Sequence, residues 1–270
     1  MPLVSIRKRI MYYRFLMPYR IKDINDNISY VDFDAFGRIS SSRIWGTEEG
    51  QPAGFPPPDE VPFMPPDTID AALSMPTPQP VAQFYFYAPA AWMKPATKDF
   101  VSAITNSQHQ YNQVVNEQGY VNVIGYQHWL RNSNTPVDKV QLADDAERQP
   151  PYILTVTTDR YYPDEQQQQR QQINFIDGAG RSLQTALRVP AGDAYIVTKD
   201  GRLAKNKLGK AKQALTSSRW AVTGRVEYDN KGLVVRQYQP FFSNSWHYIL
   251  DDSGRDSYYT HYYAPIIMIR

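Results

Sequence analysis

Acid–base or metal chemistry in this chain would have to come from a few histidines and carboxylates. The chain has four histidines: His109, His128, His247 and His261. No two of them stand at metal-ligand spacing, and no HExxH pair occurs. Asp251, Asp252 and Asp256 could supply a carboxylate pair for acid–base catalysis. A solvated turn is the better interpretation, because nothing in the sequence places these aspartates in a cleft.

An EF-hand-like spacing of oxygen ligands occurs in the stretch DINDNISYVDFD. Asp23, Asn25, Asn27 and Asp34 occupy four of the ligand positions. Ile28, however, stands where the calcium loop requires glycine, and Asp34 replaces the usual glutamate. The pattern therefore favours a turn rich in Asp and Asn over a calcium site.

Other catalytic and cofactor motifs are missing from the sequence. Without cysteine, the chain has no disulfide, no thiolate zinc site and no cysteine nucleophile. GxSxG, GxGxxG and phosphate-loop motifs do not occur either. We therefore predict no catalytic residue, no metal and no cofactor, and expect that the chain is not an enzyme.

Charge and hydropathy also bound the possible partners. The 29 basic and 27 acidic residues leave a net charge of +2, which is not the electrostatic footprint of a nucleic-acid-binding protein. No window approaches the roughly 20 apolar residues that a membrane-spanning helix needs. The basic N-terminus contains no apolar run of signal-peptide length. We expect a soluble protein with no nucleic-acid partner and no direct membrane insertion.

The elements that would position any site are predicted to be strands. The 20 tyrosines, 11 phenylalanines and 5 tryptophans favour pleated sheets, while 21 prolines disfavour long helices. Short apolar and aromatic runs between turn clusters predict two or three strands within 12–47, and the pattern resumes at Tyr152. The glutamine-rich run 166–172 is interpreted as a strand edge or its approach. The fold class is therefore mainly β.

Composition divides the chain into three segments. Residues 1–51 form an N-terminal β segment, residues 52–151 an insert-like segment, and residues 152–270 a second β segment of hairpins. The insert begins as a Pro-rich loop, because 12 of the 21 prolines lie between Pro52 and Pro95.

The rest of the insert is predicted to contain little regular structure. VAQFYFYAPAAW indicates a strand, and the apolar spacing over 97–119 predicts one amphipathic helix. Thr97 is a candidate N-cap of that helix and Gly119 its end. Residues 131–150 are polar and proline-containing, which is typical of another loop.

The most informative pattern is a short repeat of Asp, two residues and Gly. It occurs at Asp34 and Gly37, Asp177 and Gly180, Asp229 and Gly232, and Asp251 and Gly254, with Arg38 and Arg181 directly after the first two glycines. The aspartate can accept hydrogen bonds from backbone amides two residues on, and the glycine can adopt a left-handed conformation. Each repeat is therefore predicted to be a hairpin turn of an extended sheet, structural and not catalytic.

These turns resemble the YD repeats of Rhs proteins, and four longer stretches resemble a more specific family. The stretches are YYRFLMPYRIKDINDN (12–27), DAFGRISSSRIWGTE (34–48), TTDRYYPDEQQQQRQQINFIDGAGRSLQ (157–184) and RWAVTGRVEYDNKGLVVRQYQPFF (219–242). They are similar to the B component of insecticidal toxin complexes, of the TcaC/TcdB type. The stretches occur in the family's order, in its middle-to-late part, and cover most of the chain outside the loops.

The resemblance implies a structural role in toxin delivery. Family B components carry an SpvB-related region and a β-propeller that docks on a pore-forming A component. Their Rhs-type sheets join those of a C component in a hollow shell around the toxic effector. This implies a shell segment with the Rhs-type C component and the pore-forming A component as partners. Some proteins with an SpvB-related region are ADP-ribosyltransferases, but the Glu-x-Glu pair of that activity does not occur in this sequence.

The resemblance also implies a location outside the cell, reached by a route other than the general secretory pathway or by lysis. Where relatives would continue with an Asp-Pro-x-Gly-Arg turn, this chain ends in APIIMIR, so we expect a truncated fragment with exposed strand edges. Two alternatives stay open: an independent β-rich protein-binding module, and a non-functional gene remnant. The alternative location is the bacterial cytoplasm.

Overall fold

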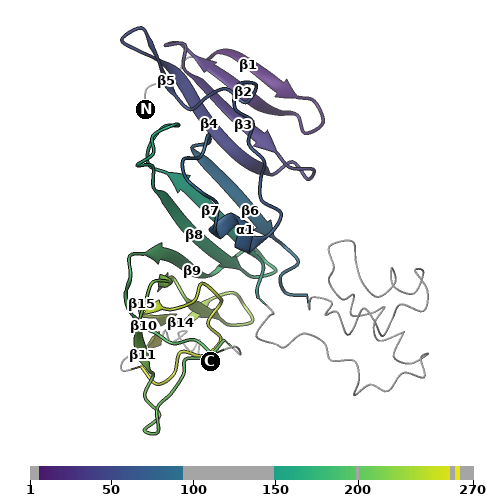
Figure 1. The fold of residues 1–270 in the computed structure, drawn as a ribbon. Coiled ribbons are helices and arrows are strands. Elements are labelled where there is room, and N and C mark those ends of the chain that lie inside the picture. The colour runs from purple at the N-terminus through teal and green to yellow at the C-terminus, as the bar shows by residue number, and fades with distance from the viewer. Residues whose placement is uncertain (1–5, 94–148, 199–200, 256–258, 262–270) are drawn as a thin grey trace, which may run out of the picture. The chain divides into compact units, whose positions relative to one another are not determined.

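The computed structural model describes residues 6–93, 149–198, 201–255 and 259–261 (Figure 1). Most of these residues lie in strands or in the turns between them, so the prediction of a mainly β protein is confirmed. The helix predicted over 97–119 and nearly all of the loop predicted over 131–150 lie outside the described residues. No helix in the described ranges is long and apolar enough to cross a membrane.

The chain forms two compact units, and each unit is built from two separate stretches. The first unit comprises Met1–Tyr87 and Ile153–Ile173, and the second comprises Ala88–Tyr152 and Asn174–Arg270. The three-segment division by composition stays a prediction.

The first unit is built on one sheet. Its strands are β1 (Ile6–Tyr12), β2 (Met17–Asp23), β3 (Ile28–Phe33), β4 (Ile39–Glu48), β5 (Gln51–Gly54), β6 (Gln83–Ala88), β7 (Tyr152–Thr158) and β8 (Gln169–Ile176). The order in the sheet is β1-β2-β3-β4-β6-β7-β8, and β5 pairs with the second half of β4. The strand predicted within VAQFYFYAPAAW is confirmed as β6. At their ends, β6, β7 and β8 run into the second unit.

Strand register sorts the side chains of this sheet onto two faces. Tyr30 lies opposite Arg20 on β2 and Arg43 on β4, so these three side chains share one face. Leu154 and Val156 of β7 are completely buried, and they alternate with partly exposed residues. Such alternation is typical of a sheet with one covered face.

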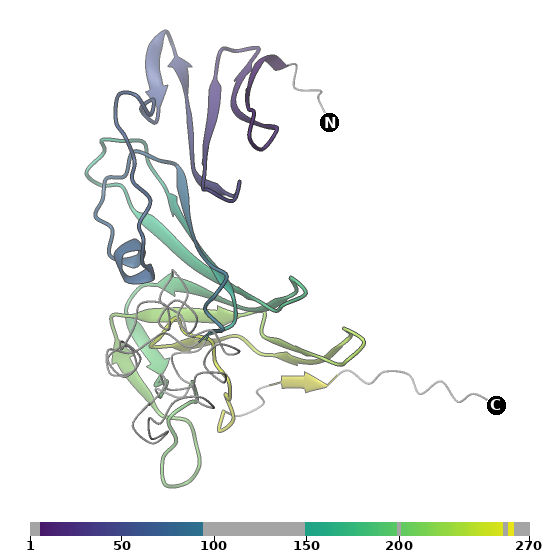
Figure 2. The same ribbon diagram turned by 90° about the vertical axis from the view of Figure 1, so that its right-hand side faces the viewer.

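The Pro-rich segment after β5 lies along the covered face (Figure 2). Proline has no N–H to donate, so carbonyl groups of such a segment need donors from elsewhere. Arg43 is only 2% exposed, and its Nη1 donates to the carbonyl oxygens of Pro56 (2.9 Å) and Val61 (2.7 Å). Phe63 packs against the buried Phe84 of β6, with ring centroids 5.4 Å apart. The segment is therefore anchored to the sheet.

Glutamines from the polar run anchor the second half of the same segment. Gln171 on β8 is buried and donates through Nε2 to the carbonyl of Leu73 (2.8 Å), the last residue of the short helix α1 (Ile69–Leu73). Gln167 is also buried, and its amide makes two bonds with the backbone of Gln79: Oε1 accepts from N (2.6 Å) and Nε2 donates to O (3.1 Å). The sequence predicted that this run lies at the edge of a strand or leads into one. In the structure it leads into β8, and the side chains of Gln167 and Gln171 are buried and hydrogen-bonded.

The second unit contains the remaining strands. They are β9 (Ser182–Val189), β10 (Gly192–Tyr195), β11 (Gln213–Thr216), β12 (Arg219–Thr223), β13 (Val226–Tyr228), β14 (Val234–Tyr238), β15 (Phe241–Ser243) and β16 (Tyr259–His261). The order in its main sheet is β9-β12-β15-β10-β11, and β13, β14 and β16 form a small separate sheet in the order β13-β14-β16.

The core of the second unit has an aliphatic and an aromatic part. Leu203, Val222, Phe241 and Ile249 form a buried cluster. Elsewhere in the unit, the rings of Tyr152, Phe175, Trp246 and Tyr248 contact one another with centroid distances of 5.3 to 6.4 Å. Aromatic packing of this kind stabilises a sheet beyond simple area burial.

Candidate functional site

The first Asp-x-x-Gly repeat closes the hairpin between β3 and β4. The Oδ1 of Asp34 accepts hydrogen bonds from the amides of Phe36 and Arg38, both at 2.9 Å. The amide of Asp34 donates to the carbonyl of Arg38 (2.8 Å), and the amide of Gly37 donates to the carbonyl of Asp34 (3.1 Å). Gly37 has a φ of 81°, in the left-handed region that glycine adopts without strain. The carboxylate of Asp34 thus accepts hydrogen bonds from backbone amides of the same turn that its own backbone helps to form.

The second repeat has the same geometry between β8 and β9. Asp177 Oδ1 accepts from the amides of Ala179 and Arg181, both at 2.9 Å, and Gly180 has a φ of 78°. In both turns the arginine that follows the glycine returns to the aspartate. Its Nε donates to Oδ2 at 2.7 Å for Arg38 and 2.6 Å for Arg181.

Each of these arginines also stacks on a tyrosine from a strand outside its own hairpin. The guanidinium of Arg38 lies 4.3 Å from the ring centroid of Tyr87, and that of Arg181 lies 4.3 Å from the ring centroid of Tyr228. The tyrosine hydroxyl then donates to the carbonyl of the residue after the arginine, Ile39 or Ser182, at 2.9 Å in both cases. We call this Asp-Gly-Arg turn with its stacked tyrosine the tyrosine clamp. Among the described residues it occurs once in each unit.

The clamps change the acidity of their aspartates. Burial by itself would raise the pKa of Asp34, but hydrogen bonds from the Arg38 amide, the Arg38 side chain and the Phe36 amide outweigh it and lower the pKa. The pKa of Asp177 is lowered mainly by the hydrogen bond from the Arg181 amide, against a smaller raising effect of burial. Both aspartates are therefore held as carboxylates.

The third and fourth repeats lack the complete clamp. Asp229 Oδ1 accepts from the amides of Lys231 (2.9 Å) and Leu233 (2.8 Å), but Leu233 stands where the first two turns have arginine, and its side chain is 55% exposed. In the fourth repeat Gly254 has a φ of 97°, and Asp251 Oδ1 accepts from the Ser253 amide (2.8 Å). Arg255, which follows Gly254, bonds to Asp252.

Two further turns have this geometry: one at Asn206, which the sequence pattern missed, and one at Asp23, where a turn rich in Asp and Asn was expected. Asn206 Oδ1 accepts from the amides of Leu208 (2.9 Å) and Lys210 (3.0 Å), and Gly209 has a φ of 75°. Asp23 Oδ1 likewise accepts from two amides, and Asp26 takes the left-handed position with a φ of 66°. A pattern that allowed Asn at the first position, and Asp or Asn at the glycine position, would have found both.

The structure describes both the Asp23 stretch, which the sequence raised as a possible cation site, and Asp252, which it raised as a possible acid–base group. Oδ1 of Asp23 is engaged by its own turn, and none of the described residues forms a cluster of three or more His, Asp or Glu that could hold a metal ion. The expectation of a solvated turn is wrong for Asp252, which is 1% exposed. Asp256 and the side chain of His261 lie outside the described part of the chain, as do His109 and His128.

Asp252 lies between two buried arginines. Its Oδ1 accepts from Arg225 Nη1 (2.5 Å) and its Oδ2 from Arg255 Nη2 (3.0 Å). Arg225 also donates to the carbonyl of Leu250 (3.0 Å) and lies over the ring of Tyr238 at 3.8 Å. Burial raises the pKa of Asp252, against the opposing effect of the two arginines. Because the carboxylate is enclosed by its ion pairs, this cluster ties the fourth turn to the loop after β12 and is not an exposed acid–base group.

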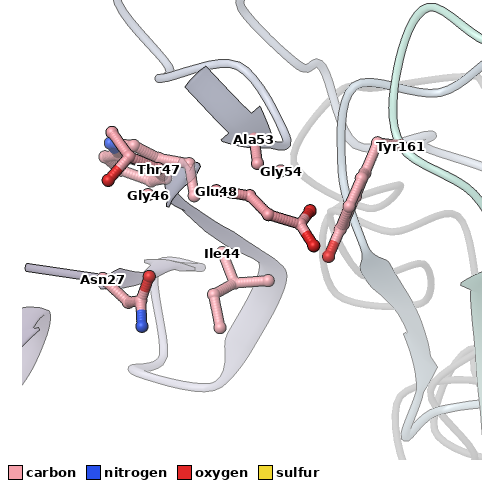
Figure 3. Close-up of a pocket in the computed structure, with 9 residues that line it drawn as sticks. Asn27, Ile44, Gly46, Thr47, Glu48, Ala53, Gly54 and Tyr161 are labelled. Carbon is pink, nitrogen blue, oxygen red and sulfur yellow. The ribbon is translucent and has the colours of Figure 1, made fainter. Parts of the chain in front are cut away.

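A pocket in the first unit lies beside the hairpin of β4 and β5 (Figure 3). Its volume is about 310 Å³, and it is lined by Asn27, Ile44, Trp45, Gly46, Thr47, Glu48, Ala53, Gly54 and Tyr161. In Figure 3 the carboxylate of Glu48 is turned toward the hydroxyl of Tyr161. Apart from Asn27, no candidate site residue in the sequence belongs to this pocket.

Solved structures supply the comparison with known proteins. No family model matches the chain, and no curated protein does. The crystal structure of TcdB2-TccC3-Cdc42 matches with 39% identity and a TM-score of 0.80, covering 90% of this chain and 11% of that chain. The crystal structure of TcdB2-TccC3-TEV matches with 40% identity, a TM-score of 0.80 and the same coverage.

The structure of the Photorhabdus luminescens Tc holotoxin pore gives the same result. It matches with 39% identity and a TM-score of 0.81, covering 90% of this chain and 11% of that chain. This chain therefore spans about a tenth of the length of the solved chains it matches. The resemblance found in the sequence is confirmed: in sequence and in fold, the chain is related to a segment of the Tc toxin B-component type.

Proposed function

We propose that this chain forms part of the β-sheet wall of a Tc toxin shell that encloses an effector, and that it catalyses no reaction. The observation that carries the proposal is the tyrosine clamp, which occurs with matching distances at Asp34–Arg38 and Asp177–Arg181. A clamp uses a tyrosine from another strand to hold a turn, so it ties the Asp34–Arg38 turn to β6 and the Asp177–Arg181 turn to the small sheet of β13. It presents no reactive group to solvent.

The faces of the sheet in the first unit support a wall. One face is covered by the Pro-rich segment, which Arg43 and the glutamines of β8 hold in place. The opposite face, by register, carries Ile21, Ser29, Val31, Ser42, Ile44 and Gln83 on four strands, with Arg9 of β1 opposite Ile21. The chain itself thus covers one face of the sheet, as expected for an antiparallel sheet with a covered side and a solvated side.

The proposed partners follow from the solved relatives. A segment of a shell would be assembled with an Rhs-type C component, and the complete complex with a pore-forming A component. Such a complex would act outside the producing cell. The relatives support this proposal because they are a Tc holotoxin pore and TcdB2-TccC3 assemblies.

Co-expression with an Rhs-type C component tests the proposed function. We expect the two chains to elute together in size-exclusion chromatography and the effector region to resist protease. A double variant, Arg38→Ala with Arg181→Ala, should lose both effects, whereas Lys207→Ala, an exposed lysine outside the clamps, should keep them. A monodisperse monomer that ignores the C component and melts cooperatively would instead support an independent β-rich binding module.

A further inference from the structure

The pocket beside β4 and β5 carries a single charged group. Among its lining residues only Glu48 is charged, and no hydrogen bond or ion pair within the described part of the chain engages its carboxylate. A carboxylate accepts hydrogen bonds and donates none, so it selects a ligand that donates. The neighbouring hydroxyl of Tyr161 can also accept a hydrogen bond (Figure 3).

The apolar part of the pocket comes from two aliphatic side chains, and two further lining residues are glycines. Ile44, which is 45% exposed, and Ala53 supply methyl groups, while Gly46 and Gly54 leave room. The Oδ1 of Asn27 lies 2.2 Å from the position that a Cβ on Gly46 would occupy. Any side chain at position 46 would therefore displace this wall.

A tight turn and a ring contact flank the two polar groups of the pocket. Glu48 ends β4 next to a tight turn in which Glu49 and Gly50 have φ values of 51° and 80°. The ring of Tyr161 meets the buried ring of Phe55 edge to face, with centroids 5.3 Å apart. Because the Tyr161 ring is already packed on Phe55, less side-chain entropy is lost there when a ligand binds.

We propose that this pocket binds an alkyl-ammonium or alkyl-guanidinium group. The methylene stem of such a group lies on Ile44 and Ala53, and its cationic head donates to the carboxylate of Glu48 and to the hydroxyl of Tyr161. A volume of about 310 Å³ is at the lower end of ligand pockets, which suits one flexible side chain or a small amine. An anion is disfavoured because the only formal charge in the lining is negative. Two sources fit this chemistry: a lysine or arginine side chain of a polypeptide, and a free diamine.

The test is an NMR titration of the full 270-residue chain, with backbone signals of Gly46, Thr47 and Gly54 as the readout. The probes are a capped Ala-Ala-Lys-Ala-Ala peptide, the same peptide with norleucine in place of lysine, and cadaverine. We expect saturable shifts with the lysine peptide and none with the norleucine peptide, which keeps the stem but not the charge. If cadaverine binds as tightly as the lysine peptide, the source is a free diamine, and tighter binding of the peptide indicates a polypeptide side chain.

Two variants and a matched control complete the test. Glu48→Gln should weaken binding of the lysine peptide by about two- to fivefold, as expected for an exposed ion pair. Tyr161→Phe should weaken it while the ring stays on Phe55, and Glu49→Gln, which changes the adjacent glutamate outside the pocket lining, should leave it unchanged.

Ionic strength gives a second measurement that needs no variant. Binding should weaken as salt is raised, because the exposed charge pair is screened. Equal binding of the norleucine peptide, an unchanged affinity in Glu48→Gln, or no titration with any probe would overturn the proposal. Its failure would leave the proposed wall role untouched, because that role rests on the tyrosine clamps and is tested by co-elution.

Discussion

At the scale of single residues, the turns show why Asp, Gly and Arg recur together. The two carboxylate oxygens of the aspartate have different partners. Oδ1 accepts hydrogen bonds from backbone amides, and in the clamps Oδ2 accepts one from the arginine Nε. The glycine supplies a left-handed backbone, and at Gly37 it also permits a close approach. A Cβ there would lie 2.8 Å from Cδ1 of Phe15, whereas a Cβ on Gly50, which has almost the same φ, would contact nothing within 4 Å.

These two glycines give a matched prediction within the first unit. Gly50→Ala should lower the free energy of unfolding by about 1–2 kcal/mol, the cost of a left-handed alanine. Gly37→Ala should cost about 1–3 kcal/mol more, because Phe15 must also move. Urea unfolding followed by tryptophan fluorescence measures both. Equal losses in the two variants would show that the Phe15 contact does not constrain the turn.

The acidity of Asp177 predicts a pH dependence. The pKa of Asp177 is lower in the folded chain than in the unfolded chain. The carboxylate therefore stabilises the fold at pH values above its ordinary pKa, and this contribution is lost as the pH falls through the pKa of the folded chain. Asp177→Asn keeps the oxygen that accepts the amides, as Asn206 does naturally, but loses the charge.

The free energy of unfolding of the unchanged chain should therefore fall more steeply than that of Asp177→Asn between about pH 5 and pH 2. Urea titrations at several pH values measure this difference. Parallel curves for the two proteins would mean that the carboxylate is not stabilised by the turn.

At the scale of elements, the Pro-rich segment is held on the sheet by buried polar side chains. A strand in the same place would instead be held by a ladder of backbone hydrogen bonds. Arg43 and Gln171 each donate to carbonyls that no backbone amide in the described residues reaches. If such a buried carbonyl group loses its hydrogen-bond donor, it remains shielded from water, and the lost hydration is no longer compensated by a hydrogen bond. The glutamines therefore determine the path of this segment over the sheet, although they stand almost 100 residues away from it.

Replacing one buried glutamine tests this. Gln171→Leu should lower the free energy of unfolding by about 1–3 kcal/mol, because the carbonyl of Leu73 loses its partner. Gln168→Leu, at a neighbouring exposed position, should change it by less than about 0.5 kcal/mol. Hydrogen exchange should show lost protection in residues 69–80 of the first variant alone. Unchanged protection there would argue against the glutamine anchor.

At the scale of the whole molecule, each unit needs two stretches that are distant in the chain. The first unit takes β7 and β8 from beyond residue 152, after the chain has entered the second unit. Thr158 donates to the carbonyl of Ala82 (3.0 Å), and Gln167 bonds to Gln79, so the two stretches share backbone as well as side-chain contacts. Non-local pairing of this kind makes the unit dependent on the complete chain.

A chain shortened to residues 1–93 should therefore not fold cooperatively. It keeps β1 to β6 but lacks β7 and β8, so Val81 and Phe84, both completely buried, would lose part of their cover. Thermal unfolding followed by circular dichroism should show a broad transition for the short chain and a sharp one for the full chain. A sharp transition in both would mean that the second stretch is dispensable.

The sequence by itself determined the class of fold, most of the hairpin turns and the relationship to Tc toxins. These follow from local signals: strand-forming aromatics, the Asp and Gly that a tight turn requires, and long stretches in the family's order. Only the tertiary structure decided that Tyr87 and Tyr228 clamp the turns of other hairpins, that Asp252 is buried between two arginines, and that Glu48 and Tyr161 share a pocket. The reason is physical: apart from the Asp252–Arg255 pair, each of these contacts joins residues from 27 to more than 100 positions apart, and the register and burial that bring them together leave no periodic trace in the sequence.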